Sequence, residues 1–514
     1  MTTCSIDDCS LEVYEDSSNC ILHCEKSAYP QDFHKIGFLS SFYKELILFI
    51  VEQEFSYKSE TSEFNKSNLE EFLKGNDNES TSDHLNKDIK VAFSNIVYPS
   101  RDSRDSFDYL NLLKKLGAIH FDSCQFHVYG LDLGDIRCFY QDCVFHDRWS
   151  IYNSPILEND NSVLYQCCTF NKSVSTYTTD KGKRKIDSQL FNNCNFQKGI
   201  EFESVVFNAP IFNNTDDMDL HLESIRLLDC EVKDKFILNH CKIGLFKLED
   251  SLIESKFEFK SNVVKIFQIF NTNFSKVVDT YETKFTKFNL EKSIFEDFVG
   301  FEKCLFGYAN EANDDLVAKF TYATFLSFIN FRNTRFVSGL DIENINLKEA
   351  PNFLKSQINA KYCNRETFRI IKSSFDKTGN YIEANKYFAH EMQKYKEELK
   401  GTNRTQEKLI LFLNEKISNY GQSYIRPIIY MLVTSIIYYI LILGYEQNVV
   451  YEIHPGINGV LNIFSSILNR VAVNILPFSK FLKEGMEFIS LIFYIVYASL
   501  IWQTLVAVKR HTRR

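Results

Sequence analysis

The sequence predicts a β-solenoid followed by an α-helical adaptor and two transmembrane helices, with a small zinc-binding segment at the N-terminus. Three observations lead to this prediction: a five-residue period of large apolar side chains, two long uncharged apolar stretches near the C-terminus, and a group of cysteines with a histidine at the start. At 514 residues the chain is too long for one compact core, so several units are expected. We expect a zinc-binding segment (1–28), a helical and loop region (29–118), the solenoid (119–340), the adaptor (341–425) and the membrane unit (426–514).

The repeat runs from about Phe121 to Phe336. Its unit is a large apolar residue, a second one five positions later, and a small residue two positions before the second, as in FDSCQF (Phe121–Phe126) and FEKCLF (Phe301–Phe306). Neither the period of a helix nor that of a strand gives this spacing. A coil with four short faces gives it, because each face sends one large side chain to the axis while the small residue lies near a corner. Between Leu227 and Phe306 the second large residue returns at Val232, Ile243, Ile253, Val264, Phe274, Phe285, Phe295 and Phe306.

Half of the 14 cysteines fall on the small position of this repeat. These seven are Cys124, Cys143, Cys168, Cys194, Cys230, Cys241 and Cys304. A free cysteine packs as a small hydrophobe, and a disulfide framework would not require this regular placement. We therefore expect reduced cysteines inside the solenoid. The alternative is an ordinary β-rich domain with many of the chain's 47 phenylalanines, but the long run of in-phase units favours the solenoid.

This run resembles the pentapeptide-repeat family. The resemblance implies a right-handed quadrilateral β-helix in which stacked coils lean on their neighbours. The match is degenerate, because Phe dominates where Leu is commoner in the family and Cys replaces much of the usual Ala. The phase is broken at Glu158–Asn161, Tyr177–Lys185 and Asn213–Asp219, where we expect loops.

The N-terminal cysteines have the spacing of a small metal site. Cys4, Cys9, Cys20 and His23 would supply two ligands from one turn and two from a second, and three thiolates with an imidazole form a closed tetrahedral zinc set with a structural role. Metal binding would supply the folding energy that this polar segment lacks. Cys24 is a spare or an alternative fourth ligand. The competing interpretation is a disordered tail with incidental cysteines.

Two helical regions flank the repeat. Ile36–Val51 is apolar enough for a buried helix, and Ser59–Lys90 is polar and predicts a loop. Beyond Phe336, where the five-residue phase ends, a helix pair with a break at Asp376–Asn380 resembles the turn and second helix of a tetratricopeptide unit, with Ala384 at the helix contact and Tyr387 or Phe388 as its apolar partner. A single such unit forms no solenoid, so we expect a structural cap; a peptide-binding helix pair is the alternative.

Pro427–Tyr445 and Phe488–Val508 are uncharged and long enough to cross a bilayer, and buried helices of a soluble domain are the alternative. Arg426 and the basic tail Lys509–Arg514 predict cytosolic N- and C-termini and a location in the inner (cytoplasmic) membrane. The polar start of the chain has no signal-peptide pattern, which agrees with a cytosolic body.

The connector between the two spans contains a third apolar stretch, Gly459–Phe478. A re-entrant helix there would give the plan of two-helix ion channels, with Gln503 facing a bundle interior and a homo-oligomer around the pore. We see no TVGYG-like filter and no acidic ring, so an amphipathic connector on the membrane surface explains the same residues.

No catalytic motif is present: the sequence lacks GxSxG, the phosphate-binding GxxxxGK, GxGxxG and HExxH, and the His146-Asp147 pair follows a repeat residue by chance. We therefore expect no enzyme, and the net charge of −9 argues against nucleic acid as a partner. The expected function is a membrane-tethered pentapeptide-repeat scaffold or sensor that binds a protein partner through its solenoid. A channel-like or membrane-disrupting effector in a bacterial stress or phage response is the alternative. A gyrase-binding DNA mimic is disfavoured by the basic Lys181–Lys185 stretch.

Overall fold

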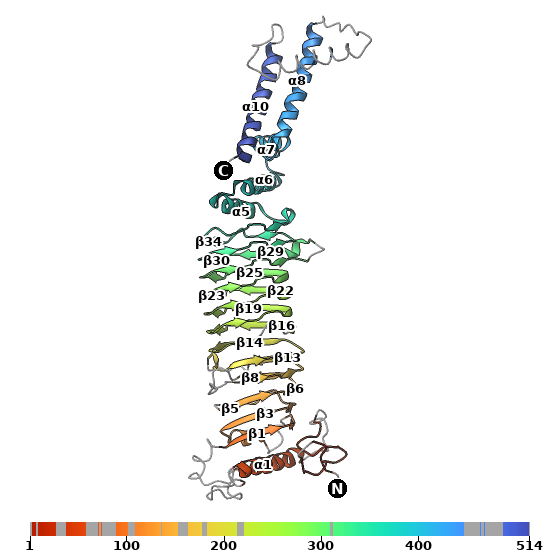
Figure 1. Ribbon diagram of the computed structural model, residues 1–514, viewed down its shortest axis with the longest axis vertical. Helices are drawn as coiled ribbons and strands as arrows, with labels where there is room; N and C mark the ends of the chain where they lie inside the picture. Colours follow the sequence, from red (N-terminus) through yellow and green to blue (C-terminus); the bar gives the residue numbers. More distant parts are fainter. Residues whose placement is uncertain are drawn as a thin grey trace. The chain divides into compact units, whose positions relative to one another are not determined.

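The structure is a computed structural model in which the chain forms two compact units, Met1–Tyr362 and Cys363–Arg514 (Figure 1). The residues described are 3–6, 9–26, 37–57, 70, 73–74, 89–100, 108–134, 136–152, 163–176, 182–212, 220–308, 312–446, 463, 467 and 487–512.

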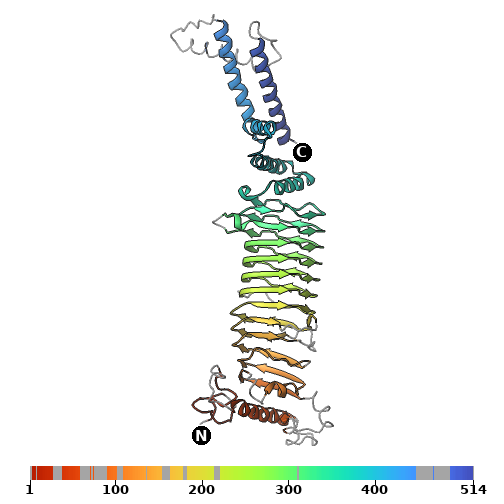
Figure 2. The ribbon, with the colours of Figure 1, turned by 180° about the vertical axis from the view of Figure 1, so that it is seen from behind.

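The first unit is a β-solenoid of about 10 turns, as the sequence predicted. Its described strands pair in parallel in five sheets that connect successive coils (Figures 1 and 2). In the largest sheet, long strands such as β25 (Lys284–Glu291) continue around a corner and pair with two strands of the next coil. Two sheets belong to the N-terminal coils: β1 (Lys90–Ser94), β3 (Ala118–Asp122), β5 (Arg137–Gln141), β8 (Val163–Gln166) and β12 (Gln189–Asn192) form one, and β2 (Val97–Tyr98), β4 (Gln125–Phe126), β6 (Val144–Phe145), β9 (Thr169–Phe170) and β13 (Asn195–Phe196) the other.

A twelve-stranded sheet runs along most of the solenoid. It contains β7 (Trp149–Ile151), β10 (Val174–Thr176), β14 (Ile200–Glu203), β16 (His221–Leu228), β19 (Lys242–Glu249), β22 (Val263–Phe270), β25 (Lys284–Glu291), β28 (Leu305–Phe306), β29 (Ala318–Thr321), β32 (Arg335–Phe336), β33 (Leu340–Asp341) and β35 (Gln357–Ile358).

The two remaining sheets complete the later coils. One contains β11 (Arg184–Ile186), β15 (Val205–Phe207), β17 (Glu231–Val232), β20 (Leu252–Ile253), β23 (Asn273–Phe274), β26 (Ile294–Phe295), β30 (Thr324–Phe325) and β34 (Asn346–Leu347). The other contains β18 (Phe236–Ile237), β21 (Phe257–Glu258), β24 (Val278–Asp279), β27 (Val299–Gly300) and β31 (Ile329–Asn330). Short 3₁₀ turns lie at Asp314–Leu316 and Ala360–Tyr362.

The coil that begins with β19 shows how the five-residue period produces this fold. Ile243, Leu248, Ile253 and Phe259 are all buried, so one large side chain per face fills the interior. Equivalent corner residues of successive regular coils are 21 positions apart. That spacing is four faces of five residues with one residue added at a corner.

The corners explain the small position of the repeat. The residue just before it adopts a left-handed backbone at most corners, including Asp142, Asp250 and Lys303, and this conformation turns the chain. The small side chain that follows points inward and bonds the backbone. Cys143 Sγ, for example, donates to the carbonyl of Phe121 in the preceding coil at 3.4 Å. All seven cysteines predicted at this position are buried and free, which confirms that they are packing residues.

Aromatic rings stack from coil to coil along the interior. In one column Phe126, Phe145, Phe170 and Phe196 follow one another with centroid separations of 5.0, 4.6 and 5.1 Å. Burying each such side chain contributes roughly 1.5–3 kcal/mol of transfer free energy. The high phenylalanine content of the sequence is therefore explained by the packing of these side chains in the core.

The ladder of strands is longer than the five-residue pattern indicated. It begins with β1, before the expected start at residue 119, and it continues through β33, β34 and β35 after the expected end at 340. The later coils were missed because Asn and Lys alternate with smaller apolar residues there, and Leu347 and Ile358 are only half-buried. The expected loops at 158–161 and 213–219 lie outside the described residues, as do 177–181 and most of 59–90. The end of the expected loop at 177–185 is wrong: Arg184 and Lys185 belong to β11, which pairs with β15.

Helix α1 (Phe38–Tyr57) covers the N-terminal coil together with the short α4 (Tyr109–Leu113). The ring of Phe42 contacts those of Tyr98 and Tyr109 with centroids 6.0 and 5.8 Å away, and Phe49 stacks on Phe93 at 5.8 Å. The buried helix predicted from the apolar stretch before Val51 is thus confirmed where the structure describes it, and it closes an end that would otherwise expose apolar rings.

The second unit is helical. It contains α5 (Arg365–Lys377), α6 (Tyr381–Glu398), α7 (Thr405–Ser418), α8 (Ile425–Glu446) and α10 (Glu487–Thr512). Gly379, with a φ of +75°, ends α5, and the side chain of Asn380 caps α6. Ala384 and Tyr387 are buried in the helix contact, and Tyr387 stacks on Phe375 at 5.6 Å. The predicted break is present, and of the two alternatives for the apolar partner of Ala384, Tyr387 is the one buried in the contact.

Helices α8 and α10 are long and apolar enough to cross a membrane, over Ile425–Gly444 and Ile489–Thr512. They pack on each other through polar pairs: Ser435 Oγ lies 2.9 Å from Tyr497 Oη, and Tyr438 donates to Ser490 at 2.7 Å. Almost all of the connector stretch Gly459–Phe478 lies outside the described residues.

Candidate metal centre

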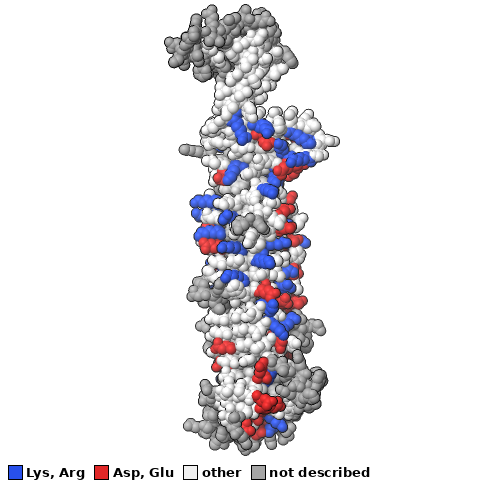
Figure 3. Space-filling model, turned by 90° about the vertical axis from the view of Figure 1, so that its right-hand side faces the viewer, with Lys and Arg blue, Asp and Glu red and all other residues white. Residues whose placement is uncertain are grey.

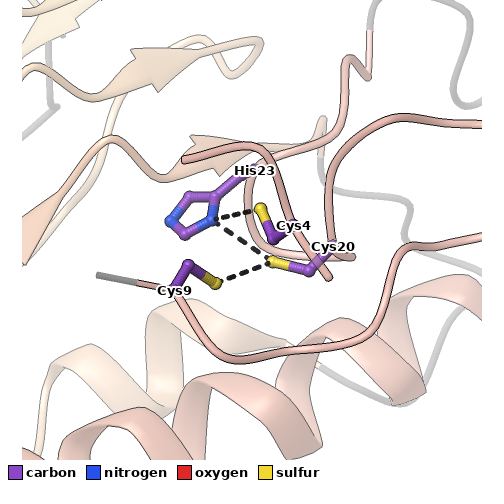
Figure 4. A group of neighbouring side chains, drawn as sticks. All are labelled: Cys4, Cys9, Cys20 and His23. Carbon is purple, nitrogen blue, oxygen red and sulfur yellow. Dashed lines mark hydrogen bonds between the residues drawn. The ribbon is translucent and has the colours of Figure 1, made fainter. Parts of the chain in front are cut away.

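The four predicted ligands, Cys4, Cys9, Cys20 and His23, come together at the N-terminal end of the solenoid unit (Figure 4). Their ligand atoms all lie within 4.8 Å of one another. His23 Nδ1 is 3.2 Å from Cys20 Sγ and 3.5 Å from Cys4 Sγ, and Cys9 Sγ is 3.8 Å from Cys20 Sγ. An ion bound tetrahedrally at 2.0–2.3 Å separates its ligands by about 3.3–3.8 Å. The cluster could therefore hold a metal ion.

Local backbone structure sets these positions. Cys4 follows Thr3, which forms an antiparallel β-bridge with Glu12, and the N–H of Cys4 donates to the carbonyl of Leu11 at 3.0 Å. Cys9 follows a turn closed by its N–H and the carbonyl of Ile6 at 3.2 Å. Cys20 and His23 share one turn, in which the N–H of His23 donates to the carbonyl of Cys20 at 3.1 Å. The two-residue spacer puts both side chains on the same side of that turn.

Cys24 is not part of the cluster. Its Sγ donates instead to the carbonyl of Ile21 at 3.6 Å, and the side chain is buried. Of the two alternatives for the fourth ligand, the structure brings His23 to the three cysteines.

The electrostatics of the cluster follow from its burial. Desolvation raises the pKa of the Cys20 thiol to about 12 and also raises that of Cys9. Burial acts in the same sense on Cys4, but hydrogen bonds from the backbone of Cys20 and Ile6 lower its pKa overall. Burial lowers the pKa of His23, which keeps the imidazole neutral with a lone pair available to a metal. Thiols this close together ionise together only when a cation balances their charge.

Asn19 and Lys26 support the cluster from outside, and the sequence analysis missed both. Asn19 Nδ2 donates to the carbonyl of His23 at 3.3 Å. The buried Lys26 Nζ donates to the carbonyls of Leu22 and Cys24 at 3.1 and 3.0 Å, and burial lowers its pKa to about 8. A lysine three residues after a ligand carries no sequence signal of burial, because lysine is almost always exposed.

The N-terminal segment that contains the cluster contacts both the first strands of the solenoid and helix α1. The N–H of Val97 in β2 donates to the carbonyl of Leu22 at 2.9 Å, and His23 forms a hydrogen bond with the backbone of Ser94 at the end of β1. Lys26 Nζ lies 5.2 Å from the ring of Phe42 in α1. Such outer contacts orient a metal ligand and couple it to the fold.

Neither the His146-Asp147 pair nor the small cavity in the solenoid forms a second functional site. His146 Nε2 lies 2.9 Å from Gln125 Oε1 and its ring stacks on that of His127 at 4.3 Å, while Asp147 forms an ion pair with Lys172 at 2.7 Å. These are contacts between neighbouring coils on the solenoid surface. A cavity of about 30 Å³ between Leu133, Trp149 and Tyr165 has room for about one water molecule.

No protein-family model, curated protein or solved structure matches this chain. Its function is therefore inferred from its own residues.

Proposed function

We propose that this protein is a membrane-tethered, non-enzymatic scaffold or sensor of the pentapeptide-repeat type, whose solenoid binds a protein partner. The observation that carries the proposal is the joining, in one chain, of a solenoid with a closed aromatic core to two apolar helices with uncovered outer faces. On α8 and α10, Ile436, Ile440 and Leu505 are 46, 59 and 60% exposed. Surfaces this apolar are stable in lipid and not in water.

Basic residues at one end of the helix pair support an orientation in which that end faces the cytosol. Arg510 near the end of α10 bonds the carbonyl of Tyr420, just before α8 begins, so both helices have their basic ends together. Arg426 and Lys509 lie at this end and are exposed. The positive-inside rule makes that side cytosolic, and both chain termini are then cytosolic in an inner membrane.

The polar contacts of the helix pair favour an anchor over a pore lining. Ser435, Tyr438, Ser490 and Tyr497 pair with one another inside one chain. Gln503, expected to face a bundle interior, donates to Asn414 Oδ1 at 2.7 Å and accepts from Ser418 at 3.0 Å. These groups satisfy each other without water or an ion.

We assign zinc to the Cys/His cluster. Three thiolates and one imidazole at tetrahedral spacing are typical of structural zinc, and the set leaves no open position for a substrate. When bound, the ion would cross-link the N-terminal segment and make it rigid. The contacts of Leu22, His23 and Lys26 would then hold this rigid segment against the first coil.

The outer side of the twelve-stranded sheet is the best candidate for the partner surface. Lys242, Lys265, Lys284, Lys287 and Lys319 are exposed on its neighbouring strands β19, β22, β25 and β29. Figure 3 shows Lys and Arg side chains gathered over the middle of the solenoid, with Asp and Glu mainly along one edge. A rigid basic surface of this kind favours a partner with an acidic face.

Membrane fractionation of the intact chain tests the tether. We expect it to stay in the membrane after salt and carbonate washing, and recovery in the soluble fraction would contradict the proposal. Measuring membrane potential in the same cells tests the conducting alternative, since an anchor leaves the potential unchanged.

Proximity labelling from the N-terminus of the intact chain tests the partner surface. The double variant Lys265→Glu and Lys287→Glu is expected to lose neighbours that the wild-type chain labels. Lys235→Glu and Lys276→Glu are the matched control, because these lysines are also exposed but precede β18 and β24 in a different sheet. Equal labelling by both variants would remove the basic surface from the proposal.

A further inference from the structure

Helix α7, which precedes the first span, has an unusually apolar outer face. Leu409, Ile410, Phe412 and Leu413 are 60, 58, 47 and 44% exposed. An exposed apolar surface of this kind marks a site that contacts another protein or a membrane.

The opposite side of α7 packs on the adaptor. Leu411 is buried in a cluster with Ala389 and Leu399 of the α6 region. Ser418, about two turns after Leu411 on the same side of the helix, is also buried. One side of α7 therefore packs against the adaptor, and the opposite, apolar side is exposed.

The charges of α7 divide between the same two sides. Its acidic residues turn to α6, where Glu407 accepts a hydrogen bond from Tyr395 and Glu415 pairs with Lys396. Its lysines flank the apolar face: Lys416 is exposed, with its ammonium 6.0 Å from the ring of Phe412, and Lys408 donates to the carbonyl of Thr402 at 2.7 Å. The outer side thus combines apolar and positive groups, which suits an anionic lipid surface.

The orientation of α7 agrees with such a surface. In Figures 1 and 2, α7 is seen nearly end-on at the base of α8, while α8 and α10 run along the page. A helix lying across the direction of two spans, at their end, lies in the plane of the bilayer surface. The apolar surface also continues into the span, since Tyr424 and Ile425 are 43 and 55% exposed.

We propose that α7 is an interfacial helix that inserts its apolar face between the anionic headgroups of the bilayer that α8 and α10 cross. This inference rests on the proposed membrane tether. Leu409, Ile410 and Leu413 enter the acyl boundary, and Lys408 and Lys416 contact lipid phosphates. The α6–α7 packing then fixes the helical adaptor against the membrane surface, so that the adaptor does not swing freely on a linker.

Photo-crosslinking of the intact chain in bilayers tests the inference. Benzoylphenylalanine is introduced singly at Leu413 on α7, at Ile436 on α8 and at Ile382 on α6, and adducts formed in phosphatidylglycerol–phosphatidylcholine vesicles are weighed by mass spectrometry. Ile382 is the matched control, because it is 67% exposed on the adaptor. We expect phospholipid adducts at Leu413 and Ile436, and none at Ile382.

The outcomes separate the inference from the function on which it rests. Lipid adducts at Ile436 with none at Leu413 would overturn the interfacial helix and keep the tether. An adduct between Leu413 and a second copy of the chain would also overturn it, and would identify the face as a subunit contact. Lipid adducts at neither position would remove both proposals.

The lysines give an independent test. With Lys408→Gln and Lys416→Gln, the Leu413 adduct in anionic vesicles should fall by about fivefold for each lysine, which is the preference of one basic residue for an anionic surface. The Ile436 adduct should not change. An unchanged Leu413 adduct would show that lipid phosphates do not recognise this helix.

Discussion

The large apolar side chains of the solenoid are buried in its interior, whereas many of those on the C-terminal helices are exposed on the outside. In the regular coils Phe246, Phe267 and Phe288 are at most 2% exposed and stack on one another. On α8 the comparable residues Ile436 and Ile440 are 46 and 59% exposed. The same kind of residue thus forms a core in one region and an outer surface in the other. The proposed membrane tether accounts for the difference, because it gives the solenoid water as its solvent and the two helices lipid.

The largest effect is expected at the N-terminal segment of the solenoid unit, whose Cys/His cluster could hold a metal ion. His23→Ala should abolish binding of one zinc ion per chain, because structural zinc contributes about 10 kcal/mol or more to the folding of such segments. Metal analysis measures the stoichiometry, and hydrogen exchange measures the protection of residues 9–26 and of the β19–β22 coils.

Protection should be lost in the segment and kept in the coils. Cys24→Ala is the matched control, since Cys24 lies outside the cluster and its replacement should leave the zinc in place. Full protection of residues 9–26 in metal-free protein would show that the apolar contacts of this segment suffice, and would remove the contrast with the coils.

The second prediction tests the solenoid side of the comparison. Phe267→Ala should destabilise the coils by about 3–5 kcal/mol, because it empties a fully packed position. Phe270→Ala in the same strand is the control: Phe270 is half-buried beside the Lys292 ammonium, 5.1 Å from its ring, and its loss should cost about 1 kcal/mol or less. Guanidinium unfolding of the intact chain in detergent measures both. Equal costs would mean that the interior stack is not the source of stability.

The third prediction tests the helices. Ile436→Lys should oppose membrane insertion of α8 by about 2.5–3.5 kcal/mol, the cost of a lysine near the centre of a span, and should raise the fraction of chain released by carbonate. Ile382→Lys is the control, because Ile382 is exposed on α6, outside the spans. If both variants fractionated alike, the exposed apolar surface of α8 would not face lipid.

Much of this organisation could be predicted from the sequence, because it depends on local periodicity. The spacing of large residues predicted the solenoid, and two uncharged stretches predicted the two helices that are long and apolar enough to cross a membrane. Four spaced residues predicted the Cys/His cluster that could hold a metal ion. The corners could not be predicted in the same way. Lys303 and Tyr322 take the left-handed conformation, which is rare for such residues, because the coils above and below fix the turn.

The apolar face of α7 was also invisible in the sequence. Its apolar residues, from Leu409 to Leu413, are consecutive, and a buried core helix or a membrane-surface helix can both contain such a run. Only the packing of Leu411 on α6 shows which side remains open.

The smallest effect is expected at a corner hydrogen bond, which separates polar from apolar contributions inside the solenoid. Thr283 Oγ1 donates to the carbonyl of Phe259 at 2.7 Å and accepts from the N–H of Asn262 at 3.3 Å, in a fully buried site. Thr283→Val keeps the shape but leaves both backbone groups without a partner, so it should cost about 1–3 kcal/mol. Thr286→Val in β25, the strand that follows Thr283, is the control, because Thr286 is only half-buried, and its replacement should change stability by less than about 0.5 kcal/mol. Guanidinium unfolding compares the two variants. Equal stability would mean that the corner side chains act only through their small size, and the cysteines at equivalent corners would then be sufficient substitutes for threonine throughout the solenoid.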